Sequence, residues 1–143
     1  MKLDDLPSGY TVFIDANIFI SAAIDIGPDG EHSRAVLSTI ENGILEGYSC
    51  ILTIDEVYYK IFKLRSKNDA QEACRALLTM RGLHFTDAST RVVERALDLM
   101  QDTDLLPRDA IHLASMESSG ITTIISADSD FDRIKGIKRE IPS

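Results

Sequence analysis

Short unbroken runs of apolar, strand-forming residues alternate along this chain with longer segments in which apolar residues recur at helical spacing. An unbroken apolar run predicts a strand that is covered on both faces, because such a strand needs no polar alternation. We predict strands at residues 11–14, 48–52, 83–86 and 122–127, with a short fifth strand near 137–141.

The intervening segments predict helices over residues 16–24, 33–46, 53–65, 68–80, 89–101 and 107–118. The Gly/Pro-rich stretch DIGPDGEH, residues 25–32, is predicted to be a loop. Alternating strands and helices predict an α/β fold, a three-layer sandwich with a mainly parallel central sheet of four to five strands flanked by helices. The length of 143 residues favours a single domain over residues 1–143.

The composition is that of a globular protein, with 44% hydrophobic and 27% charged residues, and it argues against disorder. Cys50 and Cys74 lack metal-ligand spacing and suit free thiols in a reducing cytosol. The start, MKLDDLPSGY, contains no apolar leader run, and no apolar stretch approaches the length of a membrane span. We therefore expect a soluble, cytoplasmic protein without a membrane partner.

The net charge of −8 argues by itself against nucleic-acid binding, which usually requires a basic face. The charge is uneven, however, because KIFKLRSK (60–67) and RIKGIKR (133–139) are locally basic. These cations are candidates for phosphate contacts, and the alternative is a solvated helix face with local charge pairs. If acids gather elsewhere and metal ions offset them, net charge says little about the substrate.

Several acids follow directly after predicted strands. Asp15 ends the first strand, Glu56 lies in the first turn after the second, and Asp128 and Asp130 follow the fourth. Parallel strands end at one edge of a sheet, where functional groups of such folds gather. Asp109 is separated from the third strand by helices, so the topology permits it to join this edge but does not require it.

Each acid also has a local structural explanation. Thr53 and Glu56 form a T-x-x-E capping box. Asp109 follows a proline at a helix start, where a carboxylate interacts favourably with the helix dipole. Asp128 or Asp130 can cap the short helix that follows. These explanations remain open beside a functional one for each acid taken singly.

Asp15 fits a structural explanation least well, because its neighbours are apolar and an unpaired buried carboxylate is costly. Carboxylates gathered within a few Å also repel, and one of them would have to hold a proton. A divalent cation removes this conflict, and oxygen ligands favour Mg²⁺ or Mn²⁺ over zinc. Such ions position phosphates and activate water, as in many nucleases.

The chain resembles the PIN-domain family, metal-dependent ribonucleases that include the VapC toxins of prokaryotic toxin–antitoxin pairs. The resemblance rests on the order and spacing of motifs over nearly the whole chain. The motifs are FIDANIF around Asp15, ILTIDEVYYKI around Glu56, PRDAIHLAS at 107–115 and IISADSDFDRI at 124–134.

The resemblance implies roles for particular residues. The positions that match the family's catalytic acidic quartet are Asp15, Glu56, Asp109 and Asp128. Asp130 matches a further acid, and Asp15, Asp109, Asp128 and Asp130 are the expected metal ligands. Asn17 matches a polar position that orients Asp15 or a water, and Ser126 stands where the family often has threonine.

The implied function is an endoribonuclease that uses Mg²⁺ or Mn²⁺ to hydrolyse RNA, leaving a 5′-phosphate and a 3′-hydroxyl. The resemblance also implies frequent homodimers and, for a toxin, a companion antitoxin protein. Arg108, next to Asp109, is the preferred candidate for a substrate contact. His112 is expected to be a packed or surface histidine rather than part of the chemistry.

Three alternatives stay open. An RNA-processing nuclease outside toxin–antitoxin systems would carry the same acids. A PIN-like module that binds RNA or protein without catalysis would use them for a structural ion or for a partner's arginine. Receiver domains and aspartate-nucleophile phosphatases fit less well, because Asn17 stands where such phosphatases need a second aspartate and IISADSDFD lacks the receiver's lysine.

Overall fold

The computed structural model describes residues 5–143. At its centre is a five-stranded sheet with the strand order β3-β2-β1-β4-β5. Its strands are β1 (Tyr10–Ile14), β2 (Leu45–Cys50), β3 (Leu83–Thr86), β4 (Thr123–Ile125) and β5 (Lys138–Glu140). All neighbouring strands pair in parallel. Residues 1–4 lie outside the described residues. The predicted domain and the stretch predicted to contain no leader both begin within these four residues.

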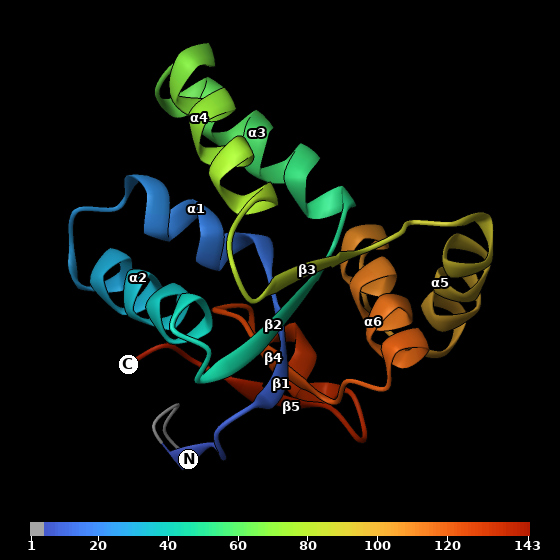
Figure 1. Ribbon diagram of the computed structural model, residues 1–143. Helices are drawn as coiled ribbons and strands as arrows, with labels where there is room; N and C mark the ends of the chain where they lie inside the picture. Colours follow the sequence, from blue (N-terminus) through green and yellow to red (C-terminus); the bar gives the residue numbers. More distant parts are fainter. Residues whose placement is uncertain (1–4) are drawn as a thin grey trace.

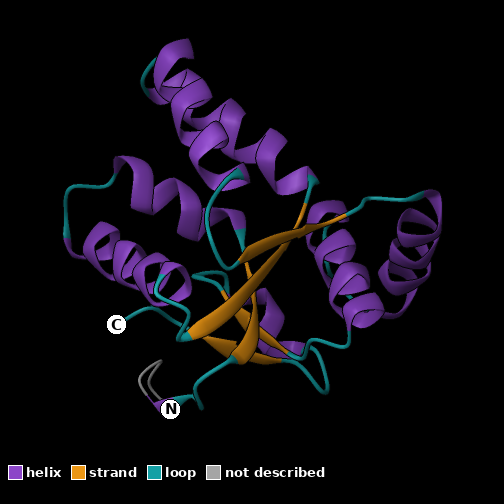
Figure 2. Ribbon diagram, viewed as in Figure 1, coloured by secondary structure: helices purple, strands orange, loops and turns teal. Residues whose placement is uncertain are grey.

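Helices cover both faces of the sheet, which confirms the predicted three-layer α/β sandwich (Figures 1 and 2). They are α1 (Ala16–Ile24), α2 (Pro28–Glu41), α3 (Leu52–Leu64), α4 (Lys67–Leu78), α5 (Thr90–Asp102), α6 (Pro107–Ser119) and the 3₁₀ helix η2 (Ser129–Arg133). Helices α1 to α4 pack on one side of the sheet, and α5 and α6 lie on the other (Figure 1). Every helix of the described residues is too short or too polar to cross a membrane.

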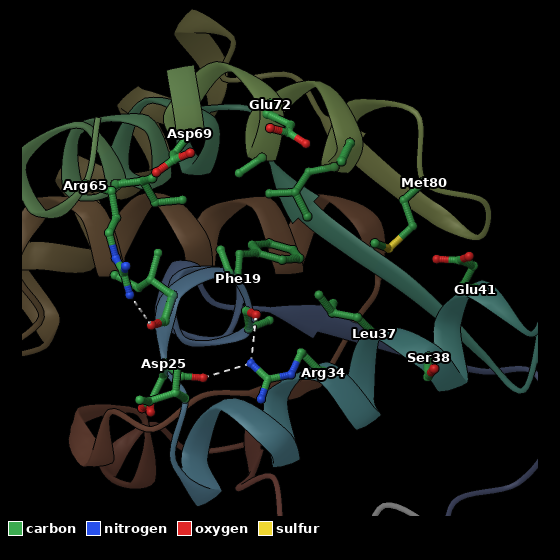
Figure 3. A pocket seen from close by; sticks show the side chains of 18 of the residues that line it. Phe19, Asp25, Arg34, Leu37, Ser38, Glu41, Arg65, Asp69, Glu72 and Met80 are labelled. Carbon is green, nitrogen blue, oxygen red and sulfur yellow. Dashed lines mark hydrogen bonds between the residues drawn. The ribbon is translucent and has the colours of Figure 1, made fainter. Parts of the chain in front are cut away.

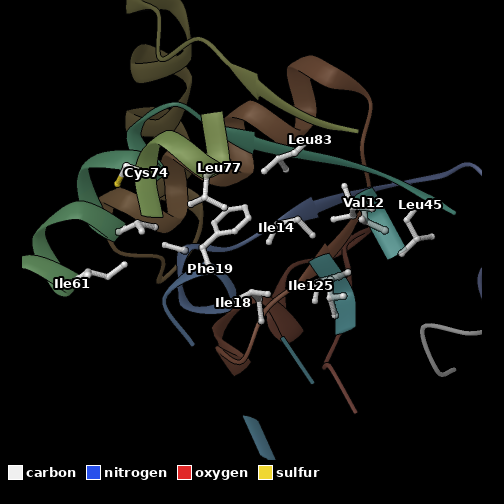
Figure 4. Packing of buried hydrophobic residues seen from close by; sticks show 14 of the residues in the cluster. Val12, Ile14, Ile18, Phe19, Leu45, Ile61, Cys74, Leu77, Leu83 and Ile125 are labelled. Carbon is white, nitrogen blue, oxygen red and sulfur yellow. The ribbon is translucent and has the colours of Figure 1, made fainter. Parts of the chain in front are cut away.

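The alternation of side chains along β1 explains the two cores. Val12 and Ile14 point into the larger apolar cluster, which includes Phe19 of α1 and Leu77 of α4 (Figure 4). Phe13, between them, points to the opposite face and packs in a cluster with residues of α6 and η2. Because successive strand residues face opposite ways, an unbroken apolar run serves both faces.

The chain connections create a switch in strand order next to β1. The first two crossovers place β2 and then β3 successively on one side of β1, and the third crossover, through α5 and α6, returns the chain to β4 on the other side. In such open sheets the crevice for ligands lies at the carboxyl ends of the two strands where the order reverses. Here those strands are β1 and β4.

The predicted loop at 25–32 is partly wrong, because α2 already begins at Pro28. Proline fits the first turn of a helix, where its missing N–H has no partner to lose. A Cβ on Gly30 would lie 1.9 Å from the carbonyl oxygen of Asp25, so this glycine permits a close approach within the α1–α2 turn. The helix also ends at Glu41 rather than at 46, and Leu45 belongs to β2.

The second strand lies earlier than predicted, at residues 45–50 rather than 48–52. Ile51 is instead the N-cap of α3 and Leu52 is its first residue, and the two are 39% and 40% exposed. An apolar run that passes directly from strand into helix does not mark the boundary between them. The fourth strand is shorter than predicted, because only Thr123–Ile125 pair with their neighbours.

Candidate active site

Asp15 lies at the carboxyl end of β1 and is 5% exposed. It is the N-cap of α1, and its Oδ1 accepts a hydrogen bond of 2.7 Å from the main-chain N of Ala16. Its Oδ2 accepts one of 2.6 Å from the hydroxyl of Ser126. These donors compensate the burial of a carboxylate at the switch in strand order.

Ser126 and Asn17 form a polar frame between the ends of β1 and β4. The Ser126 hydroxyl, which donates to Asp15, also accepts from the main-chain N of Asp128 at 2.9 Å. The Asn17 amide nitrogen lies 3.3 Å from Asp15 Oδ2, and its oxygen accepts from the main-chain N of Ala127 at 3.3 Å. The two predicted supporting residues thus fix the orientation of Asp15 relative to the segment after β4.

Asp109 lies at the centre of the acids. Helix α6 begins at the carboxyl edge of the sheet, and Asp109 occupies its first turn. Carboxylate oxygens of Asp109, Asp128 and Asp130 lie within 4.8 Å of one another, and so do ligand atoms of Asp109, Asp15 and His112. The sequence left open whether Asp109 joins the other acids, and in the structure it does.

The pKa of Asp109 is raised from 3.8 to about 7, first by burial and then by the negative charges of Asp15 and Asp128. A hydrogen bond to Asp128 and the charge of Asp130 act in the same direction. Near neutral pH, Asp109 therefore holds a proton for part of the time when no cation offsets its neighbours. A divalent cation would relieve this repulsion, so the chemistry of the acids fits a metal ion.

Glu56 borders the cluster without joining either group of close ligand atoms. Its pKa is raised, first by burial and then by the charge of Asp15, while Arg108 lowers it. Arg108 Nη1 lies 3.6 Å from Glu56 Oε1, and the Arg108 side chain is 62% exposed. Arg108 thus reaches from the acids into solvent, where the predicted substrate contact would be.

The capping box predicted for Thr53 and Glu56 is wrong. The N-cap of α3 is Ile51, which makes no side-chain cap. Thr53 is fully buried, and its hydroxyl accepts a hydrogen bond of 2.9 Å from Ser49 Oγ. Glu56 is therefore free of the local role that competed with a function at the site.

Two of the other acids do have the local roles that the sequence allowed. Asp128 caps η2 by accepting a 2.9 Å hydrogen bond from the main-chain N of Asp130, and Asp109 lies in the first turn of α6. These interactions orient the carboxylates and leave other oxygens of the cluster facing one another.

His112 lies beside Asp15 and Asp109, a position that the sequence did not predict. The sequence predicted either a packed or a surface histidine, and His112 is packed. Its Nε2 lies 3.6 Å from Asp15 Oδ1. The ring is 2% exposed, and neither nitrogen has a hydrogen-bond partner among the described residues. Burial lowers the pKa of His112 against the opposing effect of Asp15. The signal was the i,i+3 spacing from Asp109, which places both side chains on one helix face.

Two cations of the basic clusters serve the fold. Arg139 binds Asp132 through both carboxylate oxygens, at 2.7 and 2.9 Å, and donates to the carbonyl of Ser126 at 3.0 Å. This hydrogen bonding lowers the pKa of Asp132. Arg65 donates to the carbonyl of Ile24 at the end of α1, at 3.1 Å.

A second concave feature is a groove of about 640 Å³ lined by α1 to α4 (Figure 3). Phe19 lies in its middle, between α2 on one side and α4 on the other. Arg34 and Arg65 donate to main-chain carbonyls at the end of α1. The remaining charged side chains that line the groove are acids, namely Asp25, Glu41, Asp69 and Glu72.

The model of the PIN domain family matches residues 12–137. This chain belongs to the PIN domain family. The match includes the carboxyl ends of both strands of the switch and every acid of the cluster, so the resemblance seen in the sequence motifs is confirmed. No curated protein matches the chain.

Solved structures share the fold of this PIN domain. Mycobacterium tuberculosis VapC20, a toxin that cleaves the sarcin–ricin loop, is 13% identical with a TM-score of 0.71, over 85% of this chain and 92% of its own. A chain of Rickettsia felis VapBC2, bound to a promoter DNA fragment, is 14% identical with a TM-score of 0.73, over 93% and 99%. A chain of a Klebsiella pneumoniae toxin–antitoxin complex is 21% identical with a TM-score of 0.66, over 92% and 98%.

Proposed function

We propose that this chain, as one nuclease domain, is a Mg²⁺- or Mn²⁺-dependent endoribonuclease and the toxin of a cytoplasmic toxin–antitoxin pair. The observation that carries the proposal is the convergence of Asp15, Asp109, Asp128 and Asp130 at the switch in strand order. Burial, and after it the negative charges of Asp15 and Asp128, raise the pKa of Asp109 to about 7. Membership of the PIN family and the likeness to a toxin that cleaves the sarcin–ricin loop support the same conclusion.

The residues that would hold the ion are Asp15, Asp109, Asp128 and Asp130. When bound, a divalent cation activates water and stabilises the leaving oxygen of a phosphodiester. Oxygen ligands at this edge suit Mg²⁺ or Mn²⁺. Asp15 is buried and the other three carboxylates are half-buried, and a cation among them would offset their mutual repulsion.

The surrounding residues would orient the reaction. Ser126 and Asn17 hold Asp15 through its Oδ2, which leaves Oδ1 facing α6. Glu56, whose pKa is raised, lies at the edge of the cluster, where it can accept a proton during the reaction. Arg108 extends from Glu56 into solvent and would contact an RNA phosphate. The products would carry a 5′-phosphate and a 3′-hydroxyl.

The competing functions have less support. A phosphatase of the aspartate-nucleophile type needs a carboxylate where Asn17 stands, and Asn17 instead bonds Asp15 and Ala127. A binding module without catalysis has little reason to keep carboxylates that repel one another. A nuclease of RNA processing would share the site and differ from a toxin in its partner.

The partner that we propose is an antitoxin segment seated in the groove between α1 and α4. The groove is apolar around Phe19, and its four acidic side chains outnumber its two arginines, which hydrogen-bond main-chain carbonyls at the end of α1 (Figure 3). A segment with apolar and basic side chains complements it. Similar folds occur in VapBC and FitAB complexes, which supports a protein partner. We also propose that the toxin is a homodimer.

The decisive experiment for catalysis is cleavage of a structured RNA pool by wild-type and Asp109→Asn protein with Mg²⁺, Mn²⁺ or EDTA. We expect cutting that requires the metal, leaves 5′-phosphate ends and is lost in the variant. Metal-dependent cutting by the variant would remove Asp109 from the active centre. A complete lack of cutting by the wild type over a broad RNA pool would favour a binding module.

Binding to the antitoxin is tested separately, with a candidate antitoxin sought among the small proteins encoded next to the gene for this chain. The double change Asp69→Lys and Glu72→Lys should weaken that binding at least about tenfold, since it reverses the charge of one groove wall. Unchanged affinity would place the partner elsewhere. The substitutions lie on α4, away from the acids, so RNA cleavage serves as the control for intact folding.

A further inference from the structure

His112 extends from α6 into the space between Asp15 and Asp109. Its Nε2 is 3.6 Å from Asp15 Oδ1, and ligand atoms of all three residues lie within 4.8 Å of one another. Ligands bound to one ion at about 2.1 Å lie roughly 3 to 4 Å apart. The spacing therefore suits an ion shared by two carboxylates and an imidazole.

The surroundings of the ring leave its nitrogens without another role. His112 is 2% exposed, and Nδ1 and Nε2 both lack a hydrogen-bond partner among the described residues. Phe13 packs against the ring with centroids 5.6 Å apart, so an apolar surface covers that side. A buried polar atom without a partner is destabilising, and a bound cation would satisfy one nitrogen.

We propose that His112 is a metal ligand of this site, in addition to the acids, and that it shifts the ion preference from Mg²⁺ towards Mn²⁺. The inference rests on the proposed metal-dependent function and specifies which ion serves it. Mg²⁺ is a hard ion that strongly favours oxygen ligands, whereas first-row transition ions accept imidazole readily. A neutral imidazole beside Asp15 and Asp109 converts an all-oxygen site into a mixed nitrogen and oxygen site.

The test is pulsed electron paramagnetic resonance of Mn²⁺ bound to the intact protein, which detects nitrogen nuclei coordinated to the ion. We expect ¹⁴N coupling in the wild type and its replacement by ¹⁵N coupling when only the histidines carry ¹⁵N. This comparison needs no variant and so does not depend on whether a variant folds. Bound Mn²⁺ without histidine nitrogen coupling would overturn the proposal while leaving a metal-dependent nuclease intact.

His112→Leu identifies the histidine, with His84→Gln as the matched control. His84 also faces an acid, at 2.8 Å from Glu46, but it lies on β3 and is half exposed. We expect His112→Leu to abolish the nitrogen coupling and to weaken Mn²⁺ binding about tenfold or more, with a smaller effect on Mg²⁺. His84→Gln should change neither. Coupling that survives in His112→Leu would overturn the assignment, and a wild type that binds no Mn²⁺ would overturn the metal site as well.

Discussion

Two sets of acids in the segment after β4 differ in how their charges are compensated. Asp132 meets the guanidinium of Arg139 through both oxygens, and the pKa of Asp132 is lowered. Asp128 and Asp130 instead face Asp109, whose pKa is raised to about 7. The same stretch of chain thus contains an acid that is closely paired with an arginine and acids that are only weakly compensated, because Arg133 approaches Asp130 at no less than 4.0 Å.

We interpret this difference as separating a structural acid from the acids of the proposed site. The Arg139–Asp132 pair also reaches the carbonyl of Ser126, so it fastens the segment to the end of β4. The acids of the cluster receive main-chain and hydroxyl donors that fix their orientation, and no lysine or arginine takes the place of an ion between Asp15 and Asp109 among the described ion pairs. Oriented but uncompensated carboxylates are what a cation site requires.

We expect the largest difference in the rate of RNA cleavage between the variants Asp15→Asn and Asp132→Asn. Asp15→Asn removes a central ligand charge and should reduce the cleavage rate at least about a hundredfold, since even residues behind metal ligands contribute up to that factor. Asp132→Asn should leave the rate within about twofold of wild type. Equal losses in both variants would erase the distinction between the two sets of acids.

A smaller effect is expected at Ser126, whose hydroxyl donates to Asp15 and accepts from the main-chain N of Asp128. Ser126→Ala should reduce the cleavage rate about tenfold by releasing the orientation of Asp15. Ser126→Thr keeps the hydroxyl and should restore most of the rate. An unchanged rate in Ser126→Ala would show that this hydroxyl does not orient Asp15 for the reaction.

The stability of the metal-free protein should depend on Asp109. Its pKa is raised from 3.8 to about 7 in the folded state, so the folded protein binds more protons than the unfolded chain between these values. The contribution of a protonated Asp109 is present at low pH and is lost as the pH rises through about 7. Asp109→Asn should therefore melt about 5 °C higher than wild type at pH 8 and nearly equally at pH 4.

Thermal melts in EDTA across this pH range measure the difference. Asp132→Asn is the control. The pKa of Asp132 is lowered in the folded protein, in the opposite direction to that of Asp109, so this substitution should lower the melting temperature at neutral pH. A melting temperature of Asp109→Asn that stays below that of wild type throughout would show that the cluster is not self-repelling.

The smallest effect concerns the compensated pair. Arg139→Met keeps the aliphatic stem and removes the contacts to Asp132 and Ser126, and it should lower the unfolding free energy by about 1 kcal/mol. Arg133→Met is matched to it, because Arg133 is 71% exposed and approaches acids only at 3.8 and 4.0 Å. Denaturant titration should show no change for that control. Equal losses would mean that the bidentate pair adds nothing to stability.

The sequence predicted the acids that directly follow strands better than those on helices. Asp15 and Asp128 end up at the switch because parallel strands share an edge. Asp109 depended on α6 starting at that edge, which the crossover from β3 to β4 decides and local sequence does not. The direction of the His112 ring depended on how α6 packs against Phe13.

Local sequence pattern also failed to predict the start of α2 and the end of β2. The start of α2 was hidden in a Gly/Pro-rich stretch, where Pro28 fits a first helical turn and Gly30 permits contact with the Asp25 carbonyl. The end of β2 was hidden because apolar residues continue into α3. In both places, contacts with distant or neighbouring elements decide what composition leaves open.

We expect the acids around Asp109 to bind a divalent cation. The most direct measurement is the change in melting temperature on adding Mg²⁺ or Mn²⁺ to wild-type, Asp109→Asn and Asp132→Asn protein. We predict a clear rise for wild type and Asp132→Asn and little or none for Asp109→Asn, because binding stabilises only a folded site that is intact. No rise in the wild type, or an equal rise in all three proteins, would contradict the account.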